Sequence, residues 1–346
     1  MIAVVALGLG IGVFYGTQSD QVDPKFFESG TYIAYVDDEI ATGNNIFIHK
    51  ISDSGKLEAV KALEIPANQT TNTVARIPYI TYNYRVNAVE VVGDDYKNLR
   101  VEDPVMNHFY VYADGSYQGV EQTLYDARTH SQIIWTENFG TIMIGGWVNN
   151  TANERVDTAS VLQVNPEDNT VQIPELNLAR YKHAVKVYEN KIWVVAGFNR
   201  IMNKWLTSIE VMDLGADSYS WEEMAPLKRG FFNGNIQFLG STMYAFGFGQ
   251  EDSIQYPKQL EAYNIISEGT EFYLADAFEG SNQMPVSYVT ENELVVFGGY
   301  DRKTDVNSEE ICSFQGLDVN GCRGVNDTMI PSDIVGAALL HVNFEI

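Results

Sequence analysis

Four arginines recur at nearly equal spacing, and they are the first side chains in this sequence that could do chemistry. Arg76, Arg128, Arg180 and Arg229 are separated by 52, 52 and 49 residues. A guanidinium group presents a planar fork that binds a carboxylate through two hydrogen bonds. One arginine per repeating unit predicts a near-ring of cations that binds an acidic ligand or partner. The alternative is that each arginine ties adjacent units together through backbone or acidic groups.

Short acidic clusters also recur, and they include Asp37-Asp38 and Asp94-Asp95. Calcium prefers several carboxylate or carbonyl oxygens as ligands. Asp37, Asp38, Asp94 and Asp95 are therefore the candidate calcium ligands. Solvated acidic turns are the alternative, because no EF-hand spacing is present, and no other cofactor is expected.

The sequence predicts no catalytic residue. Its five histidines show no zinc-ligand spacing, and no phosphate-binding glycine loop or nucleophile elbow occurs. His130 and His183 occupy similar places in the repeat, which indicates packing or hydrogen bonding in a first strand. These observations favour a non-catalytic protein over an enzyme.

The two cysteines fit an extracellular or luminal protein, and the three glycosylation sequons permit that location without arguing for it. Cys312 and Cys322 are close enough in sequence to close a small disulfide loop in an oxidising compartment. The alternative is two unpaired thiols. Asn68, Asn149 and Asn326 begin Asn-X-Thr sequons and are the candidate glycosylation sites of a glycoprotein.

The overall charge restricts the class of partner. Acidic residues outnumber basic ones by 46 to 22, so the net charge is −24. This charge argues against nucleic acid or an anionic membrane surface as a partner, since both would repel the protein. Cations and basic proteins fit better.

The first residues form an apolar segment. No charged side chain occurs before Asp20, and the segment is shorter than the roughly 20 residues of a membrane span. Residues 1–20 are predicted to be a signal peptide, a short anchor through residues 1–16, or a tail buried in an assembly. Any contact with a membrane would be made through this segment.

A repeat of about 50 residues organises the rest of the chain. Glycines that close short apolar runs lie 52, 52, 50 and 51 residues apart, at positions 93, 145, 197, 247 and 298. Each of the four arginines precedes its glycine by 17 or 18 residues. Runs such as HAVKVY and KIWVVAGF are short and rich in β-branched and aromatic residues, which indicates strands. Four such strands per unit predict an all-β propeller.

The units resemble those of kelch-repeat proteins, which carry a Gly-Gly pair after a strand and a tryptophan before a proline-containing turn. Gly145-Gly146 and Gly298-Gly299 match the pair, while Trp221 and Pro226 match the tryptophan element. The other units keep a single glycine. The resemblance implies a kelch-type β-propeller over residues 30–346. We expect six blades, closed by pairing of Val335 to Val342 with the strand at Tyr32 to Val36, which would remove an exposed sheet edge.

These observations favour a secreted or membrane-attached protein with an interaction or structural role. It would bind a protein partner or assemble with copies of itself. Some kelch proteins similar to this one bind acidic peptides through arginines, and this implies a partner-binding role for the recurring arginines. The alternative is a secreted carbohydrate-active enzyme or glycan-binding propeller that uses carboxylates in the loops at its faces.

Overall fold

The computed structural model describes most of the strands and many of their turns. The described residues are 27, 29–37, 44–51, 57–65, 79–93, 107–120, 128–149, 155–164, 172–249, 258–274, 286–289, 294–297, 300–301, 306–307, 310–315, 318–324 and 334–342. They consist of strands, turns and loops, with no helix among them. A search of these residues for a helix that could cross a membrane accordingly finds none.

The strands follow from local sequence, as the pair β13 (Ala184–Tyr188) and β14 (Lys191–Val195) illustrates. Both are rich in valine, whose branched side chain suits a pleated strand. They are joined by Glu189 and Asn190, which have φ angles of 48° and 56°. Positive φ at both central residues matches the right-handed twist of antiparallel strands. This connection therefore forms a tight hairpin.

Six antiparallel sheets of three or four strands account for most of the described residues, and we number them in chain order. The first sheet contains β29 (Ile334–Val342), β1 (Gly30–Asp37), β2 (Asn44–Ile51) and β3 (Leu57–Ile65). The second contains β4 (Tyr79–Asn83), β5 (Ala88–Gly93), β6 (Asn107–Val111) and β7 (Tyr117–Gly119). The third contains β8 (Gln132–Thr136), β9 (Gly140–Ile144) and β12 (Val161–Gln163).

The remaining sheets repeat this order. The fourth contains β13, β14, β17 (Ile209–Asp213) and β18 (Glu222–Met224). The fifth contains β19 (Phe231–Leu239), β20 (Thr242–Gly249), β21 (Lys258–Asn264) and β22 (Gly269–Leu274). The sixth contains β23 (Val286–Val289), β24 (Leu294–Phe297), β27 (Glu310–Gln315) and β28 (Asp318–Gly324). Three small hairpins project from the third, fourth and sixth sheets: β10 (Trp147–Asn149) with β11 (Arg155–Asp157), β15 (Phe198–Asn199) with β16 (Lys204–Trp205), and β25 (Tyr300–Asp301) with β26 (Val306–Asn307).

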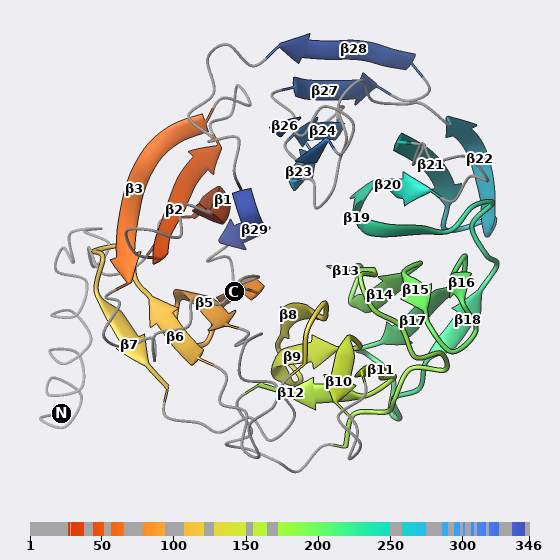
Figure 1. Ribbon diagram of the computed structural model, residues 1–346, viewed down its shortest axis with the longest axis horizontal. Helices are drawn as coiled ribbons and strands as arrows, with labels where there is room; N and C mark the ends of the chain where they lie inside the picture. Colours follow the sequence, from red (N-terminus) through yellow and green to blue (C-terminus); the bar gives the residue numbers. More distant parts are fainter. Residues whose placement is uncertain are drawn as a thin grey trace, which may run out of the picture.

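The sheets are arranged around a common centre. Figure 1 shows the first strand of each sheet nearest the centre and the last strand at the rim. We call β29, β4, β8, β13, β19 and β23 the inner strands. An all-β chain with antiparallel sheets in this arrangement is consistent with the predicted kelch-type propeller.

The two ends of the described chain lie together in the first sheet. Strand β29 pairs antiparallel with β1, so that Val342 lies opposite Gly30 and Val335 opposite Val36. A register shift occurs between Tyr35 and Val36. The first sheet thus joins residues that are about 300 positions apart in the sequence.

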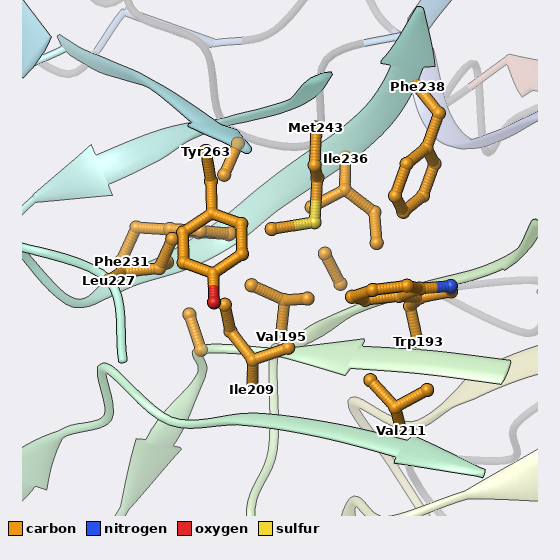
Figure 2. Close-up of a cluster of buried hydrophobic side chains, with 13 residues drawn as sticks. Trp193, Val195, Ile209, Val211, Leu227, Phe231, Ile236, Phe238, Met243 and Tyr263 are labelled. Atoms are coloured by element: carbon orange, nitrogen blue, oxygen red, sulfur yellow. The ribbon is translucent and has the colours of Figure 1, made fainter. Parts of the chain in front are cut away.

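A hydrophobic core fills the space between neighbouring sheets. Between the fourth and fifth sheets, Trp193, Val195 and Ile209 face Ile236 and Met243 (Figure 2). All of these side chains are buried. Burial of each large apolar side chain contributes about 1.5–3 kcal/mol, so this packing holds the sheets in place.

The strand register corrects the alignment of the repeats by one residue. Val195 pairs with Ala184 and Ile209, and Ile144 pairs with Gln132 and Val161, so these two positions are equivalent. The residues that follow them, Ala196 and Gly145, both have a φ of 58°. Gly197 is therefore equivalent to Gly146 and not to Gly145.

The same register separates His130 from His183. His130 is equivalent to Lys182, and both have a positive φ, at 56° and 54°. The Lys182 amide donates to the His130 carbonyl at 2.9 Å, and the Asn233 amide donates to the Lys182 carbonyl at 2.9 Å. These three residues thus repeat one backbone link between successive inner strands, and His183 lies one position beyond the place equivalent to His130.

Candidate functional site

Two of the recurring arginines lie inside the protein. Arg128 and Arg180 are each 0% exposed. Arg128 Nη1 donates to the carbonyls of Gly145 at 3.2 Å and Ser160 at 2.9 Å, and Nη2 donates to Ser160 Oγ at 2.7 Å. Arg180 Nη1 donates to the carbonyls of Ala196 and Ser208, and its Nη2 donates to Ser208 Oγ at 2.9 Å. Each guanidinium therefore holds the ends of strands in its own sheet.

A buried carboxylate completes this network in the fourth sheet. Arg180 Nη2 donates to Glu210 Oε1, and Glu210 also accepts the backbone amides of Asn177 at 2.6 Å and Leu178 at 3.2 Å. Burial lowers the pKa of Arg180, while the adjacent Glu210 acts in the opposite direction. The arginine is thus committed to the carboxylate and carbonyls of its own unit.

Arg229 does not occupy the place that the spacing predicted. In the fifth sheet, Glu261 accepts the backbone amides of Lys228 at 2.7 Å and Arg229 at 3.3 Å, just as Glu210 accepts those of Asn177 and Leu178. Arg229 is therefore equivalent to Leu178.

The position equivalent to Arg180 in the fifth sheet is Phe231. The Gly146 amide donates to the Arg180 carbonyl, and the Gly197 amide donates to the Phe231 carbonyl, both at 2.8 Å. Arg229 is exposed, whereas Arg76 lies outside the described residues. Among the described residues, the recurring arginines do not converge on one ligand site.

A different set of residues comes together at the end of the sheets where the small hairpins project. We call Trp147, Tyr181, Phe198, Trp205 and Phe232 the aromatic row. Their ring centroids follow one another at 4.5 Å, 5.7 Å, 5.8 Å and 4.3 Å in that order. All five side chains are partly exposed. The row therefore runs continuously along the third, fourth and fifth units.

Backbone pairing positions this row. Thr129 and Trp147 form an antiparallel bridge, as do Tyr181 and Phe198, and these pairs are equivalent in successive units. Each bridge fastens a projecting hairpin to the segment that leads into an inner strand. The aromatic side chains of neighbouring units are thereby brought within contact of one another.

Cations border the aromatic row. The guanidinium carbons of Arg155 and Arg200 lie 5.6 Å and 5.4 Å from the Trp147 ring centroid, and Lys182 Nζ lies 5.2 Å from that of Phe232. Such distances permit cation–π attraction. The His130 ring lies 4.4 Å from Trp147. Burial and the neighbouring Lys182 and Arg155 lower the pKa of His130 to about 3, so it is neutral at physiological pH.

The buried Asp157 holds the backbone of Arg200 in place. Its Oδ2 accepts the backbone amide of Arg200, and it is the residue opposite Trp147 in the β10–β11 hairpin. Burial raises the pKa of Asp157, whereas the amide and charge of Arg200 oppose that change. The carboxylate thus holds the β15–β16 hairpin against the β10–β11 hairpin.

The segments around the row are basic although the chain is acidic. Residues 128–136, 178–188, 196–207 and 226–240 contain no aspartate or glutamate. They contain the cations Lys182, Lys186, Arg200, Lys204, Lys228 and Arg229, besides the buried Arg128 and Arg180. At the tip of the β15–β16 hairpin, Ile201 and Met202 are 79% and 54% exposed. This end of the described sheets therefore presents aromatic, cationic and apolar side chains together.

Sequence reasoning missed a buried pair of ionisable groups between the second and third sheets. His108 Nε2 lies 2.6 Å from Glu90 Oε1, and Glu90 Oε2 accepts from Asn83 Nδ2 at 2.8 Å and from Thr141 Oγ1. Glu90 and His108 are 0% and 3% exposed. Because the group is closed to solvent, it joins the two sheets without presenting a reactive site. Their separation of 18 residues carries no recognisable motif.

Only some residues of the other predicted sites lie among the described residues. Asp38, Asp94 and Asp95 lie outside the described residues, and Asp37 is known only as the last residue of β1. No group of three or more potential metal ligands occurs among the described side chains. Asn68 and Asn326 also lie outside the described residues, and Asn149 ends β10. Calcium binding and glycosylation remain predictions.

The two cysteines occupy opposed backbone positions in a strand pair. Cys312 of β27 is the register partner of Cys322 in β28. Directly opposed residues of an antiparallel pair have Cα atoms about 4.5–5.5 Å apart, which lies within the range that a disulfide bridges. The predicted disulfide therefore remains a prediction that the backbone permits.

One family model matches the chain. The Kelch motif matches residues 179–228, which include the fourth sheet, the buried Arg180 and Trp221. Trp221 is buried and donates from Nε1 to the Pro174 carbonyl at 3.0 Å. No curated protein matches the chain. The kelch resemblance predicted from the sequence is confirmed at this unit.

Proposed function

We propose that this protein is a non-catalytic interaction propeller whose protein partner binds the aromatic row. The kelch motif supports a propeller that binds other proteins. The observation that carries the proposal is the continuous row of partly exposed rings with arginines over Trp147. Tryptophan, tyrosine and arginine are the residues that most often dominate the energy of protein interfaces.

The partner presents acidic side chains together with an apolar one. Arg200 and Lys204 of the β15–β16 hairpin are exposed and would pair with carboxylates. Ile201 and Met202 lie between them and would be removed from water by apolar contact. An acid-rich protein segment matches both properties.

In this proposal the propeller has six blades, one for each sheet of three or four strands, and the β29–β1 pairing closes it. The protein acts outside the cytosol, either secreted or attached through residues 1–16, as part of a larger assembly. The apolar start of the sequence and the opposed backbone positions of the cysteines support this location. Residues 1–26 lie outside the described residues.

The binding surface can be tested with a random copolymer of glutamate and tyrosine as an acidic, aromatic-bearing probe. Binding is measured by isothermal titration with the full chain at low and moderate salt. We expect Arg200→Glu combined with Lys204→Glu to weaken binding at least tenfold, because two attractive charges become repulsive.

Lys191→Glu, combined with Arg85→Glu, is the matched control. Both residues lie at the opposite end of their strands, next to tight turns, and the variant carries the same change in net charge. We expect its affinity to stay within about twofold of the unmodified protein. Equal weakening by both double variants would show that the probe responds to net charge alone and would contradict the proposed surface.

A further inference from the structure

Lys186 is a lone charged residue on the inner strand β13, where its surroundings are almost entirely uncharged. Its cross-strand partner is Trp193. The strands packed against β13 are β8, β14 and β19, and the one charged residue among them is Lys191 of β14. Lys191 lies opposite Tyr188, at the far end of the hairpin. Among these strands, no carboxylate is placed to neutralise the Lys186 amine.

A fixed amide accepts one hydrogen bond from this amine. Lys186 Nζ donates to Gln237 Oε1. Gln237 Nε2 in turn donates to the Ser287 carbonyl and to Ser287 Oγ, both at 2.9 Å. Gln237 and Ser287 are 2% and 0% exposed. These bonds to Ser287 keep Oε1 directed at Lys186, so the amine is held in place by an uncharged acceptor.

The environment increases the neutral fraction of this amine. Burial lowers the pKa of Lys186 to about 8, because an ammonium ion loses hydration when it is enclosed. The Lys186 residue as a whole nevertheless remains partly exposed. A lowered pKa through desolvation is one of the conditions that activate a lysine as a nucleophile.

We propose that the Lys186 amine is a covalent site for small aldehydes, which it holds as an imine. The nitrogen lone pair attacks the carbonyl carbon, and a proton passes from nitrogen to the carbonyl oxygen to give a carbinolamine. Loss of water then forms the carbon–nitrogen double bond, so one water molecule leaves for each imine formed. Gln237 Oε1 accepts the N–H of the attacking amine and leaves its lone pair free for the carbonyl carbon.

The test uses the full chain with limiting acetaldehyde and sodium cyanoborohydride at pH 7.5, which traps an imine as a stable ethyl-lysine. Peptide mass spectrometry compares the rate of labelling at Lys186 with that at the exposed Lys204. At this pH an amine with a pKa near 8 is about two-hundredfold more often neutral than an ordinary lysine. Because a less basic amine is intrinsically a weaker nucleophile, we expect labelling at Lys186 to be about tenfold faster or more. Labelling at or below the rate of Lys204 would overturn the proposal.

Two variants test the chemical cause. Lys186→Arg keeps a long cationic side chain, and it should remove the fast site while leaving the Lys204 rate unchanged. Gln237→Glu places a carboxylate beside the amine, which stabilises the ammonium form, and should reduce labelling of Lys186 to the rate of Lys204. Persistence of fast labelling in a folded Gln237→Glu variant, with folding checked by thermal unfolding, would also overturn it. The unmodified protein provides the primary rate comparison, so the test does not depend on either variant.

Discussion

The buried Arg180 and the exposed Arg229 provide a direct test of the repeat alignment. Their spacing assigns the same role to both, whereas the strand register assigns Arg180 to a buried network and Arg229 to the surface. We therefore compare Arg180→Met with Arg229→Met. Methionine keeps a long unbranched side chain of similar reach, so that the main change is the loss of the guanidinium group.

The expected magnitude follows from the bonds that Arg180 makes. Its guanidinium donates to three backbone carbonyls, to Ser208 Oγ and to Glu210, and the Glu210 side chain is only 1% exposed. Removing one partner of a buried ion pair costs about 3–5 kcal/mol. Glu210 keeps its two backbone amides, so we expect about 3–4 kcal/mol for Arg180→Met. For the exposed Arg229 we expect a change within about 0.5 kcal/mol.

Urea unfolding followed by tryptophan fluorescence measures the free energy of unfolding of both variants. A double-mutant cycle of Arg180→Met with Glu210→Gln should give a coupling energy of about 1–3 kcal/mol. Similar losses in Arg180→Met and Arg229→Met would refute the register-based alignment. A coupling energy near zero would refute the ion pair as the source of the loss.

Three further predictions concern a buried histidine, the paired glycines and the cysteines. The pKa of His183 is lowered from 6.5 to about 3 by burial and by Arg180, so its contribution to stability is complete above pH 6.5 and is lost as the pH falls toward 3. His183 alone should contribute a loss of about 1.4 kcal/mol per pH unit below pH 6, and His183→Leu should reduce the slope measured by urea unfolding by about that amount. Gly146→Ala should destabilise the protein by about 2–4 kcal/mol, because the added Cβ would lie 2.1 Å from a serine hydroxyl. In the control Gly240→Ala the added Cβ meets nothing within 4 Å, so the cost should be about 1 kcal/mol. Equal losses of stability in the two variants would contradict this prediction. Finally, Cys312 and Cys322 should appear as one linked peptide before reduction, and two free thiols in the native protein would contradict the disulfide.

The fold class could be predicted because its signals are local. Short runs of β-branched and aromatic residues and a period of about 50 residues are visible along the chain, and they correctly indicated an all-β fold. The exact alignment failed because the left-handed position after the second strand is glycine at Gly145 but alanine at Ala196, both with a φ of 58°. Alanine tolerates this conformation at a cost of about 1–2 kcal/mol, so glycine does not mark it reliably.

The candidate site could not be predicted in the same way. The recurring arginines were found from their spacing, but only the structure distinguishes a buried guanidinium from an exposed one. No motif joins Trp147, Tyr181 and Trp205, which become neighbours when hairpins of successive units are fastened to inner strands. Glu90 and His108 likewise meet through the pairing of β5 with β6.

By itself the sequence determined the strand-rich repeat, the acidic character of the chain and the kelch resemblance, because these depend on residue types and on neighbours close in the chain. Only the tertiary structure decided which side chains share a surface and which are enclosed. The physical reason is that burial depends on side chains supplied by other units. The guanidinium of Arg180 is enclosed with Ala196, Ser208 and Glu210, which lie 16 to 30 residues further along the chain, while Arg229, two positions away from the equivalent place in the following unit, remains in solvent.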